Sequence, residues 1–94
     1  MDLGLKGKRA VVAAASAGLG FATAQNLLAA GTSVAICGRD ADRVNTAVQL
    51  LGNNAIGVVE DISTSSGATR FMDKAISALG GIDILVTNGG GPKP

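Results

Sequence analysis

The chain has 94 residues, of which 47% are apolar and 14 are glycine, so it is long enough for one hydrophobic core and too short for two. Eight basic and seven acidic residues give a net charge of +1 without a basic run, and the aromatic residues are Phe21 and Phe71. This composition argues against a nucleic-acid-binding surface, a stacking platform for bases and a polybasic membrane patch.

Charged residues at 39–43 interrupt the most apolar half of the chain, and residues 1–6 lack the apolar core of a signal peptide. We therefore expect a cytoplasmic protein that does not span a membrane. Cys37 stands alone in an apolar run, which indicates a small buried residue and excludes a disulfide framework. We expect no metal site.

The first predicted element is a strand over residues 9–15, a continuous apolar run as in a parallel sheet covered on both faces. A helix follows, because apolar residues from Phe21 to Leu28 recur at the spacing of one helix face until Gly31. The turn between them consists of small residues. It allows close approach of a ligand, and the first helical turn presents free N–H groups and the positive end of the helix dipole.

This strand, turn and helix predict a site for a dinucleotide pyrophosphate. The residues assigned to the cofactor here are Ala14, Ser16, Ala17, Gly18, Leu19 and Gly20. Taken alone the Gly-x-Gly is also compatible with a tight turn chosen for packing. Thr23 stands where the Gly-x-Gly-x-x-Gly pattern has its third glycine.

The remaining elements alternate in the same way. Residues 33–37 predict a second strand, and a helix over 44–51 is capped by Asp40 or Asp42 and ended by Gly52. A third strand covers 55–59, a helix runs from Ser65 to the glycines at 80–81, and a fourth strand covers 82–87.

This βαβαβαβ order predicts an α/β fold: the N-terminal half of a doubly wound, Rossmann-type parallel sheet with strand order 3-2-1-4, in one unit over residues 1–94. Ligands in such sheets bind beyond the carboxyl ends of the strands, where the strand order reverses.

The end of the second strand favours NADP over NAD. Enzymes that hold the ribose 2′-OH place a carboxylate there, and this chain has Gly38 followed by Arg39. A guanidinium binds a 2′-phosphate with paired hydrogen bonds, and no carboxylate repels it. Alternatively, Arg39 is a solvated loop residue that pairs with Asp40 or Asp42.

Two further loops carry candidate cofactor contacts. Asp61 and Ile62 follow the third strand, where a carboxylate could accept a hydrogen bond from an adenine amino group. The competing role of Asp61 is to cap the helix that begins near Ser65. The hydroxyl groups at 63–66 suffice for capping without it. After the fourth strand, a side-chain amide ties strand ends together and small residues leave room for a ribose. A plain glycine-rich linker is the alternative there. The residues of this loop are Asn88, Gly89 and Gly90.

Over its whole length the chain resembles the short-chain dehydrogenases/reductases. The family motif Thr-Gly-x-x-x-Gly-x-Gly corresponds to Ala13–Gly20, the motif Asn-Asn-Ala-Gly to Thr87–Gly90, and a Gly-Gly-Ile-Asp-Ile-Leu-Val run to residues 80–86. Ala13 and Ala14 replace the Thr-Gly pair. Ala17 stands where NADP-preferring relatives often carry a second basic residue, which leaves Arg39 to hold the phosphate.

The resemblance implies an NADP-dependent oxidoreductase that reduces a carbonyl by hydride transfer, and similarity to the 3-oxoacyl-carrier-protein reductase type implies an acyl thioester substrate. In the family the catalytic Ser and the Tyr-x-x-x-Lys pair follow the fourth strand, and this chain has no Tyr and no His. We therefore assign it no catalytic residue and expect the nucleotide-binding half of a longer enzyme, homo-oligomeric when intact and acting on a small carbonyl or alcohol.

Two other functions compete with this hypothesis. A non-catalytic nucleotide-binding module or regulator would use the same loops, and a longer reading frame with Tyr-x-x-x-Lys would separate the two. A methyltransferase on the same sheet needs an acid after the second strand, and Gly38 followed by Arg39 argues against it.

Overall fold

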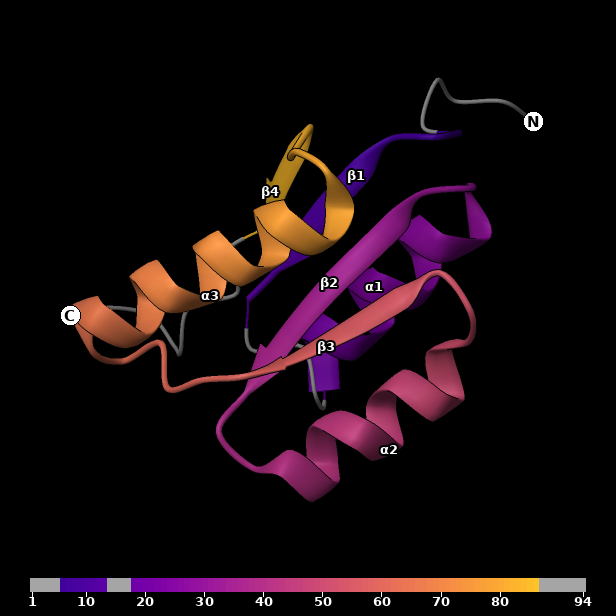
Figure 1. Ribbon diagram of the computed structural model, residues 1–94. Coiled ribbons are helices and arrows are strands. Elements are labelled where there is room, and N and C mark those ends of the chain that lie inside the picture. Colours follow the sequence, from indigo (N-terminus) through magenta and orange to yellow (C-terminus); the bar gives the residue numbers. More distant parts are fainter. Residues whose placement is uncertain (1–5, 14–17, 87–94) are drawn as a thin grey trace, which may run out of the picture.

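The computed structural model describes residues 6–13 and 18–86. Within them, strands and helices alternate as predicted (Figure 1). The elements are β1 (Arg9–Val12), α1 (Gly18–Ala29), β2 (Ser33–Gly38), α2 (Ala41–Leu51), β3 (Ala55–Val59), α3 (Ser65–Leu79) and β4 (Ile84–Val86).

The strands form one parallel, four-stranded sheet in the order β3-β2-β1-β4, which confirms the predicted order 3-2-1-4. Val11 of β1 lies opposite both Ala35 of β2 and Leu85 of β4. Parallel strands that follow one another in the chain are joined by crossover connections, and among the described residues α1, α2 and α3 provide them. The strand order reverses between β1 and β4, so the carboxyl end of β1 is the switch point of the sheet.

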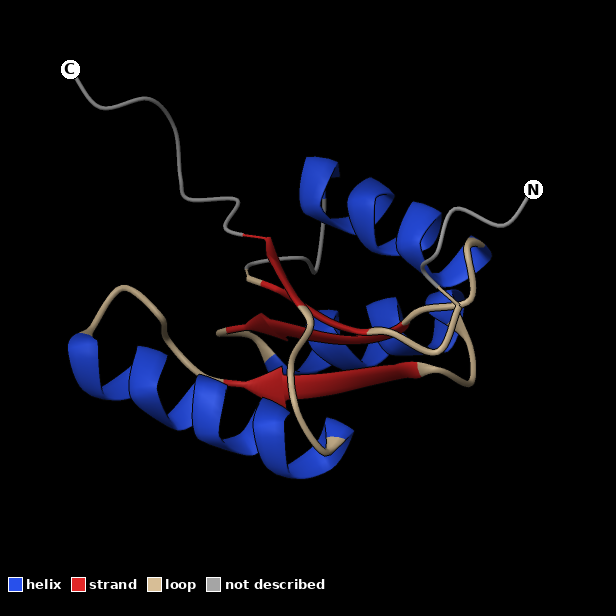
Figure 2. Ribbon diagram, turned by 90° about the horizontal axis from the view of Figure 1, so that it is seen from above, coloured by secondary structure: helices blue, strands red, loops and turns tan. Residues whose placement is uncertain are grey.

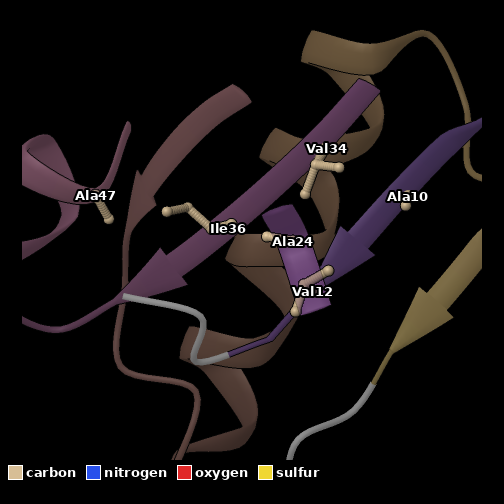
Figure 3. Packing of buried hydrophobic residues seen from close by; sticks show 6 residues of the cluster. All are labelled: Ala10, Val12, Ala24, Val34, Ile36 and Ala47. Atoms are coloured by element: carbon tan, nitrogen blue, oxygen red, sulfur yellow. The ribbon is translucent and has the colours of Figure 1, made fainter. Parts of the chain in front are cut away.

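Helices cover both faces of the sheet (Figure 2). On one face, α1 and α2 pack on alternate strand residues, which together form the cluster Ala10, Val12, Ala24, Val34, Ile36 and Ala47 (Figure 3). On the other face, α3 packs on the intervening residues, with the cluster Val11, Ala35, Cys37, Val58, Phe71 and Ala75. Burial on both faces explains why β1 and β2 are continuous apolar runs. Cys37 is fully buried, as expected.

The helix ends follow local rules. Of the two caps that the sequence left open for α2, the structure has Asp40, whose carboxylate accepts from the backbone nitrogens of Asp42 and Arg43. Gly80 ends α3 in the left-handed conformation at φ 85°, where a side chain is unfavourable. Among the described residues, no helix has the length and apolar character needed to cross a lipid bilayer.

Two predicted strand boundaries differ from the structure by two residues or more, and β2 extends one residue beyond its predicted end, to Gly38. β1 ends at Val12 rather than at Ala15, and Ala13 lies in a turn. The backbone nitrogen of Ala13 donates a hydrogen bond of 3.1 Å to the carbonyl oxygen of Val86. β4 begins at Ile84 rather than at Ile82, because the carboxylate of Asp83 accepts from the backbone nitrogen of Arg9 at 2.9 Å. The backbone nitrogen of Arg9 is thus bonded to the side chain of Asp83 and not to a backbone carbonyl of the neighbouring strand. The apolar pattern of the sequence does not reveal this change.

Candidate functional site

The helix after the central strand begins where the sequence places it. α1 starts at Gly18 and carries Leu19 and Gly20 in its first turn, and Gly20 is buried. Its first N–H groups have no partner within the helix, as in any α-helix. Ala14, Ser16 and Ala17 lie outside the described residues. Their contact with a pyrophosphate stays a prediction.

Arg39 lies exposed directly after β2. The sequence left open whether Asp40 or Asp42 pairs with it, and none of the ion pairs among the described residues involves Arg39. Asp40 is used differently, since its Oδ1 accepts from the backbone nitrogens of Asp42 at 2.9 Å and of Arg43 at 3.3 Å. Capping of α2 thus occupies the carboxylate of Asp40, and the side chain of Arg39 is exposed.

Asp61 lies at the same edge of the sheet as Arg39. The backbone nitrogen of Glu60 donates to the carbonyl of Gly38 at 3.0 Å, which extends the pairing of β2 with β3 by one residue. In the register of this pair Arg39 follows opposite Glu60, and Asp61 is the next residue along the chain. Consistent with this, the positive charge of Arg39 contributes to lowering the pKa of Asp61, after the larger effect of the hydrogen bonds from Ser63.

The carboxylate of Asp61 is fixed on one side. Its Oδ1 accepts from the backbone nitrogen of Ser63 at 3.0 Å and from the Ser63 hydroxyl at 2.6 Å. The competing role of Asp61 as a helix cap is not what the structure shows, because Thr64 caps α3 and accepts from the backbone nitrogen of Gly67. Asp61 is thus a charged acceptor held at the sheet edge.

The other two predicted loops are only partly described. Ile62 is half-buried and packs against the cluster beneath α3, which anchors the loop that carries Asp61. Asn88, Gly89 and Gly90 lie outside the described residues, two positions and more beyond the end of β4 at Val86.

Sequence reasoning missed a set of ionic contacts beside this site. The side chain of Glu60 is only 8% exposed, and its two oxygens accept from Lys74 at 2.7 Å and from Arg70 at 3.0 Å. These bonds, first that of Lys74, lower the pKa of Glu60. The signal was present, because basic residues four apart lie on one face of a helix and an acid stands at the end of the preceding strand. The ion pairs fix α3 against the end of β3.

A parallel sheet in this order, with a helix starting close after its central strand, is a Rossmann-type nucleotide-binding fold. A family model described as short chain dehydrogenase matches residues 8–94. The chain belongs to the short-chain dehydrogenase/reductase family, whose members are oxidoreductases with an NAD(P)-binding Rossmann fold.

Known relatives agree with this assignment. The 7alpha-hydroxysteroid dehydrogenase of Escherichia coli (strain K12) is 42% identical over 98 residues, which covers 99% of this chain and 38% of that protein. A crystal structure of hydroxysteroid dehydrogenase from Escherichia coli matches with a TM-score of 0.83 and 40% identity, over 93% of this chain and 38% of that one.

A second solved structure is similar in fold. The 3-ketoacyl-(acyl-carrier-protein) reductase from Brucella melitensis, complexed with NADH, matches with a TM-score of 0.81 and 31% identity, over 86% of this chain and 34% of that one. The chain thus spans little more than a third of the length of these relatives. The cytoplasmic location and the homo-oligomeric state expected from the sequence stay predictions.

Proposed function

We propose that this chain is the nucleotide-binding portion of an NADP-dependent oxidoreductase that reduces a carbonyl compound. The observation that carries the proposal is the end of β2, where Gly38 offers no carboxylate and Arg39 is exposed. A carboxylate there would accept from a ribose 2′-OH and repel a 2′-phosphate. An exposed guanidinium does the reverse, because it binds a phosphate with paired, charge-assisted hydrogen bonds.

Each loop at this edge of the sheet contacts a different part of the cofactor. In this proposal the start of α1 and the preceding turn bind the pyrophosphate, Asp61 and Ile62 contact the adenine, and the loop after β4 leaves room for a ribose. The residues of the first set are Ala14, Ser16, Ala17, Gly18, Leu19 and Gly20, and those of the last set are Asn88, Gly89 and Gly90. The described part fits a dinucleotide, since it combines a helix N-terminus, a guanidinium and a fixed carboxylate at one edge.

When bound, the nicotinamide supplies the hydride for the carbonyl carbon. In this proposal the chain's own residues hold the pyrophosphate and the adenosine part of the cofactor. The sequence has no Tyr and no His to move the proton that accompanies the hydride. As the substrate of the whole enzyme we propose a small carbonyl compound or the corresponding alcohol. A 3-oxoacyl thioester is the first to test, because a similar structure is named as a 3-ketoacyl-(acyl-carrier-protein) reductase.

The test is a direct titration of the 94-residue chain with NADPH and with NADH, followed by the fluorescence of the reduced nicotinamide. We expect NADPH to bind more tightly, because only NADPH carries the 2′-phosphate that Arg39 would contact. Equal affinities would contradict the cofactor preference, and an absence of binding to both would contradict the function. The two cofactors differ only at the 2′ position, so each is the control for the other.

A further inference from the structure

Gly67 occupies an unexpected place for a glycine. It is the third residue of α3 and is buried, although glycine is a poor helix former. It is not among the described glycines with positive φ, so a left-handed backbone does not explain it. The space around residue 67 explains why a glycine stands there. A Cβ at residue 67 would overlap the carbonyl oxygen of Asp61 far inside van der Waals contact, and would lie 2.8 Å from the Asp61 carbonyl carbon and 2.8 Å from Thr64 Oγ1.

The neighbours that a Cβ would meet are mostly backbone atoms, which do not move aside as the end of a long side chain does. The absence of a side chain at Gly67 therefore allows the start of α3 to lie directly against the main chain of Asp61. Thr64 completes this contact with one hydroxyl group, which accepts from the backbone nitrogen of Gly67 at 2.9 Å and donates to the carbonyl of Asp61 at 3.2 Å.

Together with Ser63, these contacts fix both the main chain of Asp61 and one oxygen of its carboxylate. Among the described residues, no group donates a hydrogen bond to the other oxygen, Oδ2. The loop thus presents one carboxylate oxygen in a set position at the sheet edge, and this position depends on α3.

We propose that Gly67 and Thr64 are positioning residues for the nucleotide site, which hold Asp61 where its carboxylate meets the amino group of an adenine. The inference rests on the proposed function, in which Asp61 contacts the adenine. Hydrogen bonds weaken steeply beyond donor–acceptor distances of about 3.2 Å, so a shift of the loop by the width of one methyl group removes this bond.

The experiment compares NADP with its analogue that carries unsubstituted purine, in which a hydrogen replaces the amino group of the adenine. This analogue offers the carboxylate no donor at that position and leaves N1 of the ring an acceptor. The affinity ratio of the two ligands therefore reports the contact with Asp61 separately from the rest of the cofactor. A hydrogen bond to a charged group corresponds to roughly 10-fold or more in affinity, so we expect a ratio of about that size for the unchanged chain.

In Gly67→Ala we expect the ratio to fall towards 1, with the weaker binding of NADP accounting for the change. Gly57→Ala is the matched control. A Cβ at residue 57 would also crowd its surroundings, but against the methyl groups of Val44 at 2.6 Å and Val48 at 2.8 Å, on the face of the sheet opposite α3. Both variants lower the melting temperature, and only Gly67→Ala changes the ratio.

A second pair of variants keeps the test decisive if Gly67→Ala does not fold. Thr64→Val removes the hydroxyl at nearly constant volume and lowers the ratio, whereas Thr64→Ser keeps the hydroxyl and keeps the ratio. A folded Gly67→Ala or Thr64→Val chain with the original ratio would overturn the positioning role and leave the contact of Asp61 with adenine in place. A ratio of 1 in the unchanged chain would instead contradict that contact, and the positioning role with it.

Discussion

The carbonyl oxygen of Gly38 accepts a hydrogen bond of 3.0 Å from the backbone nitrogen of Glu60, and this bond holds the ends of β2 and β3 together. Arg39 and Asp61 are the residues that follow this bond at the carboxyl ends of the two strands, and the charge of Arg39 contributes to lowering the pKa of Asp61. A cation and an anion placed there suit the two chemically different parts of an adenosine 2′-phosphate, the phosphate and the base amino group.

Replacement of Arg39 by alanine should weaken the binding of NADP and leave that of NAD nearly unchanged. Because a charged hydrogen bond contributes about 1.5–3 kcal/mol, the loss of NADP affinity should be roughly 10- to 150-fold. Lys8→Ala is the control, since it removes one exposed positive charge from the residue before β1, at the opposite end of the strands. Calorimetric titrations decide the question, and equal losses for both cofactors would refute the role of Arg39.

Gly18→Val should reduce the binding of both cofactors sharply while the far-UV circular dichroism of the chain is kept. A β-branched side chain at the start of α1 would occupy the place where the pyrophosphate approaches the helix N-terminus. If a folded variant binds as before, the glycine serves only the packing of the turn.

Acidification should destabilise the chain partly through Glu60. The hydrogen bonds from Lys74 and Arg70 hold the pKa of Glu60 below its ordinary value of 4.5, so the folded state favours the charged form. The stabilisation is present above the ordinary pKa and is lost as the pH falls through the lower pKa of the folded state.

In Glu60→Gln we therefore expect a lower urea midpoint at pH 7 and a smaller further decrease between pH 5 and pH 3 than in the unchanged chain. Asp73→Asn, which removes an exposed carboxylate from the same helix, is the control. A parallel loss of stability in the unchanged chain and in Glu60→Gln over this range would contradict the contribution of Glu60.

Phe71→Ala should be the most damaging change on α3. Phe71 is 2% exposed and fills the cluster between α3 and the sheet, so its truncation should cost about 3–5 kcal/mol. Leu50 on α2 is 70% exposed, and Leu50→Ala should change the stability by less than about 0.5 kcal/mol. Urea denaturation followed by circular dichroism measures both, and similar effects of the two substitutions would disprove the core assignment.

The 94-residue chain should show no carbonyl reductase activity and should self-associate. It has no Tyr or His to transfer a proton, and Leu85 on the outer strand β4 is 53% exposed. Within the described sheet β4 pairs on one side only, and an open strand edge is a site of association. Size-exclusion chromatography and an NADPH-oxidation assay test this. A compact monomer that turns over a carbonyl substrate would contradict both parts.

Much of the fold could be predicted from the sequence, because the signals that determine it are local. The helical spacing on α3, the stop at Gly80 and the cap of α2 all act within a few residues, and the structure contains each of them, with Asp40 as the cap that the sequence left open between Asp40 and Asp42. The end of β1 was predicted wrongly, since an apolar run does not reveal where a sheet neighbour ceases to pair.

The candidate site could be predicted less completely. The sequence placed Arg39 and Asp61 after neighbouring strands, which the structure confirms as a single edge. The burial of Glu60 under Lys74 and the contact of Gly67 with Asp61 depend on how closely α3 approaches the sheet. The distance between α3 and the sheet is set by the packing of many side chains, and no local sequence pattern predicts it.

The central position of β1 also has a consequence for the time order of folding. β1 is synthesised before its neighbours, and the contacts between Arg9 and Asp83 join residues 74 positions apart. Pairing with β2 is possible early, whereas pairing with β4 requires closure of a long chain segment, which is entropically costly and slow. During synthesis one side of β1 therefore stays without its partner until β4 has left the ribosome, so the first strand of the described sheet is paired on both sides only after the last one has been made.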